Sequence, residues 1–266
     1  MPLARTAGLV LAALTLSPVA AFANPWDNFS GLLDGGFAYS RVPLHHAVDS
    51  DQYTFQGSLL YTIDSPGLNF QIDGGNNFYF AVPHSDAHMW NAGGSVFWRD
   101  NKGTFGVSGS YFAVDAPALP LFAGKRSIAS FGMFGEYYAF GNLSLQFRGG
   151  GTAGPMGSSS GYGGGGVTFY ESPDLALHAE ANFTAFTSGH DWTDVRAEVE
   201  YLPFNHMPVS LYAGYDHTTV SYGDNASTVL AGLKIHFGQG RVLSTYNRTG
   251  PTEWTGVGAP GANIRF

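Results

Sequence analysis

The sequence predicts an all-β protein, a closed antiparallel transmembrane β-barrel of twelve strands with short periplasmic turns and longer outer loops. Two observations lead to this fold class. Apolar and polar residues alternate with a period of two over segments of about ten to fourteen residues, enough for a tilted strand to cross a bilayer. The connections between these segments alternate between short and long, as in a barrel whose two rims differ.

The composition supports a strand-rich membrane protein. Of the 266 residues only 12% are charged, about half the roughly 25% of soluble proteins, while 15% are aromatic and 37 are glycine. No run of about 20 apolar residues follows the N-terminus, which argues against a helical membrane protein. The net charge of -8 argues against a nucleic-acid partner. The absence of cysteine excludes a disulfide framework and a thiolate metal site.

Residues 1–23 have the three parts of a secretory signal peptide. Arg5 supplies a positive start, the stretch from Ala7 to Leu16 forms a short apolar core, and Ala21-Phe22-Ala23 fits a cleavage site. A buried helix or a membrane anchor is the alternative, but the apolar core is too short to span a bilayer. We therefore expect a periplasmic N-terminal segment at 24–32, a barrel at 33–238 and a Gly/Pro-rich tail at 239–266.

The expected strands follow from the alternation. In 142–148, for example, Leu143, Leu145 and Phe147 share one face, and the polar residues between them share the other. The segments with this pattern lie near 33–42, 51–63, 67–82, 88–100, 103–114, 126–140, 142–153, 160–171, 174–187, 192–202, 208–217 and 226–238.

Turn residues separate the strands at one rim, in the stretches 64–67, 100–103, 141–142, 172–174 and 203–206. The longer connections lie around 43–50, 83–87, 115–125, 154–159, 188–191 and 218–225. The longest of these, 115–125, is apolar and would fold into the barrel or lie on the outer leaflet. In lipid every backbone polar group needs a partner, so we expect the first strand to pair with the last.

Two segments resemble those of known barrels. The stretch from Trp90 to Asp100, followed by Asn-Lys-Gly, resembles a hairpin of small proteobacterial barrels. The last expected strand carries Gly232, Ile235 and Phe237 in the register of the assembly signal of such proteins. The sequence thus resembles Gram-negative outer-membrane β-barrel proteins of the porin-like kind. Leu230 departs from the signal, which prefers a polar residue there, and 29 residues follow Phe237.

The resemblance implies a place in the cell outer membrane. The expected partners are outer-membrane lipid and lipopolysaccharide, the barrel-assembly machinery during biogenesis, and small solutes. The chain also ends in Phe266, the usual last residue of this class, but the stretch before it offers no strand of ten residues.

The polar faces of the strands define the candidate lumen. Its expected pore-lining residues are Asp73, Arg99, Glu136, Arg148, Glu180, Arg196, Glu198, Glu200, Lys234 and His236, with His178 beside them. One interpretation is a set of ion pairs that fills and stiffens a narrow barrel. The other is a polar path, with a charged constriction where the three residues of 196–200 approach Lys234.

The leading functional hypothesis is a porin-like channel for the passive passage of small hydrophilic solutes. The alternative is a filled structural or surface-interaction barrel. A hydrolase at the outer rim is a third reading, with His84, Ser85, Asp86, His190 and Asp191 as its candidate groups. No activated nucleophile follows from the sequence, so we predict neither an enzyme nor a cofactor.

The remaining polar features have less specific readings. The pattern His84-x-Asp86-x-His88 places three donors on one side of an extended segment, which we interpret as scattered polar loop residues rather than a metal site. The tail 239–266 contains Arg241, Arg248 and Arg265. It is either a disordered extension, a plug whose arginines meet Glu136, Glu180 or Glu200, or a contact for another periplasmic component. We favour a loosely ordered tail.

Overall fold

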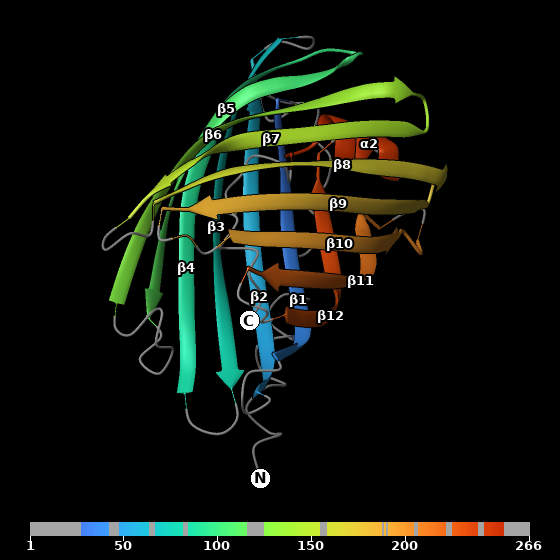
Figure 1. Cartoon of the computed structure of the whole chain (residues 1–266). Helices are drawn as coiled ribbons and strands as arrows, with labels where there is room; N and C mark the ends of the chain where they lie inside the picture. The colour runs from blue at the N-terminus through green and yellow to red at the C-terminus, as the bar shows by residue number, and fades with distance from the viewer. Residues whose placement is uncertain are drawn as a thin grey trace.

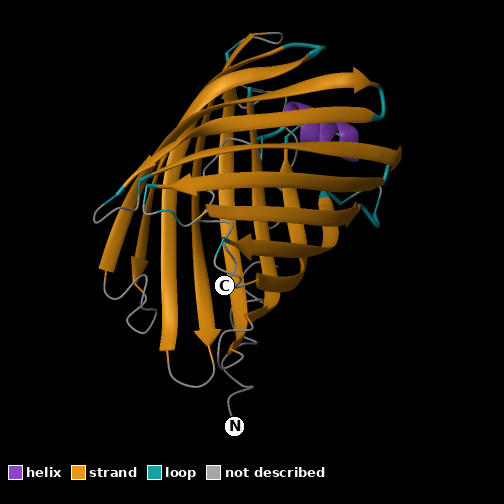
Figure 2. Ribbon diagram, viewed as in Figure 1, coloured by secondary structure: helices purple, strands orange, loops and turns teal. Residues whose placement is uncertain are grey.

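The computed structural model shows a closed barrel of twelve antiparallel strands, in which each strand pairs with its neighbour in sequence and β1 pairs with β12 (Figures 1 and 2). The structure describes residues 28–42, 48–63, 67–81, 85–115, 125–154, 159–187, 189, 191–204, 207–221, 225–238 and 242–252. The strands are β1 (Phe29–Val42), β2 (Val48–Thr62), β3 (Gly67–Ala81), β4 (Ser85–Arg99), β5 (Gly103–Asp115), β6 (Lys125–Phe140), β7 (Leu143–Ala153), β8 (Ser160–Ser172), β9 (Leu175–Phe186), β10 (Asp191–Tyr201), β11 (Val209–Val220) and β12 (Asn225–Phe237). The predicted strand number, direction and closure are confirmed.

The start of the barrel differs from the expected boundary at residue 33. β1 begins at Phe29, where it pairs with Tyr61 of β2, so 29–32 belong to the wall rather than to a preceding segment. Gly31 and the adjacent Leu32 and Leu33 hide the alternation here, because a side chain is missing at one position and two apolar residues stand together. Their register with β2 and β12 nevertheless continues without a break.

Short turns close one rim. Between β4 and β5, the Asp100 carboxylate accepts hydrogen bonds from the backbone N–H groups of Lys102 (2.7 Å) and Gly103 (3.1 Å). The Asp100 N–H in turn donates to the Gly103 carbonyl at 2.9 Å. This local bonding explains why Asp-Asn-Lys-Gly marks a tight turn in the sequence.

The two faces of the wall follow the alternation. Along β7, Leu145 and Phe147 are exposed on the outside, whereas Ser144, Gln146 and Arg148 are buried on the inside. Large apolar side chains are exposed on the outside of several strands, such as Phe131 (64%), Ile72 (63%) and Val229 (60%). The exposed outer surface is therefore suited to lipid, and the buried inner surface is polar.

Inward-facing glycines give room to large side chains of neighbouring strands. The Tyr212 hydroxyl of β11 lies against Gly232 of β12 and Gly36 of β1, where it donates a 2.8 Å hydrogen bond to the Asp34 carboxylate. Tyr162 of β8 lies in the same way against Gly132 and Gly150. A Cβ atom at these positions would overlap the tyrosine, so the glycines are required by close packing.

Neighbouring glycines of β1 offer a direct test of this packing. We expect Gly36→Ala to reduce the free energy of unfolding by about 1–3 kcal/mol, because its Cβ would overlap the Tyr212 hydroxyl. Gly35→Ala is the matched control, since a Cβ there meets no atom within 4 Å. Urea unfolding of the refolded barrel measures both. Equal effects would refute the close packing of Tyr212 on β1.

One short helix follows the barrel. α2 (Leu243–Thr249) lies at the short-turn rim, where the N–H of Leu243 donates to the Pro173 carbonyl between β8 and β9 at 2.9 Å. The expectation of a loosely ordered tail is therefore wrong for residues 242–252. Within the described part of the chain, no helix combines the length and the apolar character that a membrane-spanning helix requires.

Candidate functional site: the lumen of the barrel

The residues expected in the lumen all belong to the inward-facing sets of their strands. At least nine-tenths of the surface is buried in seven of them: Arg99, Glu136, Arg148, Glu198, Glu200, Lys234 and His236. Asp73, Glu180 and Arg196 are half-buried.

A charged network joins β10 and β12 across the one strand between them. The Lys234 ammonium lies 3.2 Å from a carboxylate oxygen of Glu198 and 3.5 Å from one of Glu200. The Arg196 guanidinium pairs with the other oxygen of Glu198. Two cations and two carboxylates thus neutralise one another, as the spacing of 196, 198 and 200 along one strand face suggested.

Two histidines and a serine surround Glu200. His178 Nε2 of β9 and His236 Nε2 of β12 each lie 3.3 Å from a Glu200 oxygen, and the Ser210 hydroxyl donates to Glu200 at 2.5 Å. The donor atoms of His178, Glu198 and Glu200 lie within 4.8 Å of one another, as metal ligands would. Because Lys234 already provides a cation between the two carboxylates, this cluster is satisfied without a metal ion.

The other expected residues form separate polar groups. Glu136 of β6 accepts a 3.2 Å hydrogen bond from Gln146 of β7, which also donates to Thr168 of β8 at 2.9 Å. Arg148 of β7 donates to Asn182 of β9 at 3.0 Å. The charged residues of β6 and β7 are therefore held by amides and hydroxyls rather than by the network of β10 and β12.

The inner wall of β2–β4 also carries several uncharged amides, which were not among the residues expected in the lumen. The side chains of Gln52, Asn77 and Asn91 are all buried and face inward. The alternation in 67–82 contains the signal, since its inward positions include Asn69, Gln71 and Asn77. In a twelve-strand ring β4 lies opposite β10, so a wall rich in amides, which also carries Asp73 and Arg99, faces the charged network of β10 and β12.

An apolar cluster also lies inside the barrel and was not expected. Leu60, Phe97 and Phe134 pack together from β2, β4 and β6, and the rings of Phe97 and Phe134 meet edge to face at 5.7 Å. The Arg99 guanidinium lies over the Phe97 ring at 4.9 Å. The sequence hides this cluster because Val96-Phe97-Trp98 is apolar on both faces.

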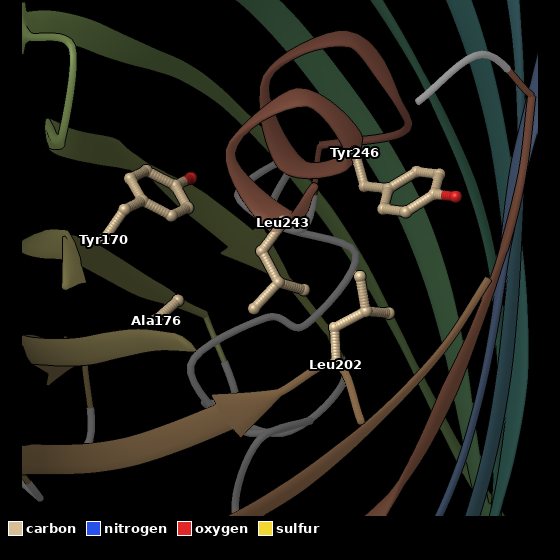
Figure 3. Packing of buried hydrophobic residues seen from close by; sticks show 5 residues of the cluster. All are labelled: Tyr170, Ala176, Leu202, Leu243 and Tyr246. Carbon is tan, nitrogen blue, oxygen red and sulfur yellow. The ribbon is translucent and has the colours of Figure 1, made fainter. Parts of the chain in front are cut away.

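Residues 242–252 enter the lumen at the short-turn rim. Leu243 of α2 is fully buried and points towards Ala176 and Leu202, while Tyr246 extends to the right in the view of Figure 3. The Tyr246 ring stacks on His236 at 4.7 Å. A cavity of about 40 Å³ lies between the tail and the wall, with Glu136, His178 and His236 among its lining residues. It has room for a few water molecules.

The expected groups at the outer rim are only partly described. His84 and His190 lie outside the described residues, as do the side-chain positions of Ser85 and Asp86. His88 contacts Asn76 at 3.0 Å and stacks on Phe78, so it belongs to the outer face of β3 and β4. His217 contacts the Ser227 hydroxyl at 3.1 Å. The histidines that are described thus have neighbours from the wall itself.

Comparison with solved structures identifies the fold. The COG4313 outer membrane channel from Pseudomonas putida F1 is similar over 84% of this chain and 100% of its own, with 11% identity and a TM-score of 0.59. The chain has the fold of an outer-membrane β-barrel. The beta domain of the Bordetella autotransporter BrkA is also similar, at 13% identity over 78% of this chain and 99% of its own, with a TM-score of 0.51.

Comparison of the sequence itself with known proteins finds no relative. No family model matches the chain, and no curated protein matches it. Because the two structural similarities are at 11% and 13% identity, they show a shared barrel architecture and nothing of the solute. The function of this outer-membrane barrel must therefore be argued from its lumen.

Proposed function

We propose that the protein is a porin-like channel of the outer membrane for the passive passage of small hydrophilic solutes. The observation that supports this function is the incomplete hydrogen bonding of the polar inner wall. Among the described residues, both polar atoms of the Gln52 amide have no hydrogen-bond partner, nor do the carbonyl oxygens of Asn77 and Asn91 or the Ser95 hydroxyl. All four residues are at least nine-tenths buried and face the lumen.

Unpartnered polar groups of this kind need an explanation. Native proteins pair most of their buried polar atoms, because an unpaired group forfeits its bonds to water. A barrel built only as a filled structural element would be stabilised by apolar or fully paired residues at these positions. Because these atoms are buried, we infer that water or a polar solute bonds Gln52, Asn77 and Asn91 when neighbouring side chains of the wall move aside.

The charges of the lumen favour solutes without a strong net charge. The network of Arg196, Glu198, Glu200 and Lys234 contains two positive and two negative groups, all held in pairs. Paired charges present a weak field to a passing ion, so we expect little preference between anions and cations. The amides of the opposite wall suit neutral solutes that donate hydrogen bonds.

The alternative is a filled structural or surface-interaction barrel. It is favoured by the same ion-pair network and by the tail segment in the lumen, both of which reduce the free cross-section. A hydrolase at the outer rim remains the third reading, and its groups His84 and His190 lie outside the described residues. We propose no enzymatic activity, because Glu200, the carboxylate that Ser210 and His236 contact, is already paired with Lys234 in the wall.

Conductance of the purified protein in a planar bilayer tests the proposal. We expect discrete conductance steps and a reversal potential near zero in asymmetric potassium chloride. Liposomes containing the protein should also take up small neutral sugars faster than empty liposomes. A folded barrel that shows no steps and no uptake, both with its tail and with the tail displaced as described next, would instead establish the structural reading.

A further inference from the structure

Buried side chains of the inner wall bind the main chain of the tail. The Gln71 amide of β3 holds both backbone groups of Thr252: it accepts from the N–H at 2.8 Å and donates to the carbonyl at 2.9 Å. Arg99 of β4 donates to the Gly250 carbonyl at 2.8 Å. Gln71 and Arg99 are 2% and 8% exposed, so the residues that hold the tail are fixed parts of the wall.

Arg248 ties the same segment to the turn between β6 and β7. Its guanidinium donates to the Ser144 hydroxyl (3.2 Å), the Gly141 carbonyl (3.0 Å) and the Phe140 carbonyl (2.9 Å). The same group lies over the rings of Tyr138 and Tyr170, at 4.8 and 5.2 Å. One side chain thus supplies three charge-assisted hydrogen bonds at the rim of the lumen.

The helix itself is a weak element. α2 has seven residues, too few for stability in isolation, and its first residues lack a side-chain cap and an acidic group. Its helical form therefore depends on the contacts with the wall, chiefly the burial of Leu243 and the stacking of Tyr246 on His236. Leaving the site therefore unfolds α2, so release of the segment and loss of its helix form a single local transition.

We propose that Val242–Thr252 is a reversible plug, bound in a peptide-binding site on the inner wall at the short-turn rim, and that the lumen conducts when the plug leaves this site. The site consists of Gln71 and Arg99 on one side and of Tyr138, Ser144 and the 140–141 carbonyls on the other. Its ligand is a segment of the protein's own chain, recognised by its main chain and by one arginine. The proposal rests on the channel function proposed above.

The first test compares two variants of the full chain in planar bilayers. Arg248→Ala removes the three hydrogen bonds at the rim, so we expect the open fraction to rise about tenfold. Lys102→Ala is the control, because it removes one positive charge from an exposed turn of the same rim without a contact to the plug. An open fraction that is the same in both variants and in the wild type would overturn the role of Arg248.

The second test fixes the plug covalently. The chain has no cysteine, so Ala176→Cys with Leu243→Cys introduces a single pair across the contact of β9 and α2. Joined by a disulfide or a short thiol crosslinker, the pair should abolish conductance, and cleavage of the link should restore it. Steps that persist at full size with the link intact would show that the solute path does not pass this site.

Hydrogen exchange separates a failure of the plug from a failure of the channel. In lipid nanodiscs the amides of Tyr246 and Gly250, which bond within the segment, should exchange at least tenfold faster in Arg248→Ala than in Lys102→Ala. Faster exchange without conductance in any variant would overturn the channel function and gating together, leaving a tail bound in a structural barrel. Unchanged exchange would overturn the site itself.

Discussion

Replacing Lys234 with methionine should reduce the free energy of unfolding of the barrel by about 3–5 kcal/mol. The Lys234 ammonium is the shared cation of two buried carboxylates, at 3.2 Å from Glu198 and 3.5 Å from Glu200. Methionine keeps the length of the side chain but leaves Glu200, which is 0% exposed, without a formal cation. Unfolding in urea, followed by the fluorescence of the five tryptophans, measures the loss.

A compensating variant separates charge from packing. Lys234→Met combined with Glu200→Gln removes one charge of each sign and leaves the pair of Arg196 with Glu198. We expect this double variant to be more stable than Lys234→Met, because no buried carboxylate then lacks a cation. If the two substitutions instead destabilise additively, the methionine acts through packing against Tyr212, whose ring lies 5.4 Å from the ammonium.

The ion-pair network of β10 and β12 changes the effect expected from removing Glu198 and Glu200. In an open charged constriction, removal of Glu198 and Glu200 would shift ion selectivity with little effect on folding. In the structure both acids are paired and buried, so replacing both with glutamine would remove the carboxylates that neutralise the half-buried Arg196 and the buried Lys234. The expected consequence is a loss of assembly of the barrel. A conductance measurement alone would not distinguish this loss from a blocked pore.

The fold could be predicted because the alternation within each strand and the hydrogen bonds within each tight turn are local and recur along the chain. A strand of 11 to 16 residues carries its inside-outside pattern in its own sequence, and turns such as Asp100 to Gly103 bond within themselves. Closure follows from the need to pair every backbone group in lipid. The pattern fails where both neighbours have the same polarity, as at Leu32 and Leu33, or where an apolar residue such as Phe97 turns inward.

The candidate site was predictable only in part, for a physical reason. Alternation assigns Arg196, Glu198, Glu200 and Lys234 to the inner wall, and their strands are close enough to bring them together. The tail has no such periodicity: its position depends on contacts between residues far apart in sequence, such as Gln71 with Thr252 and Arg99 with Gly250. No pattern in the sequence of the wall strands or of the tail predicts these contacts.

The outward face provides the second large expected effect. We expect Met133→Arg to destabilise the barrel in a bilayer by about 2–4 kcal/mol, the cost of an arginine on the lipid face near the midplane. Met133 is 55% exposed on the outside and lies in the middle of β6 (Lys125–Phe140), far from both rims. Leu145, also exposed on the outside, is the third residue of β7, where an arginine can reach the interface.

The depth of Met133 makes the test quantitative, because the cost of a charge on the lipid face falls towards the rims. Unfolding of the protein in lipid vesicles should therefore rank Met133→Arg as more damaging than Leu145→Arg. Met133→Leu, which keeps an apolar side chain of similar volume at the same place, should remain within about 1.5 kcal/mol of the wild type. If Met133→Arg and Met133→Leu are equally stable, this face of β6 contacts water or protein rather than lipid, and the assignment of inside and outside on this strand is wrong.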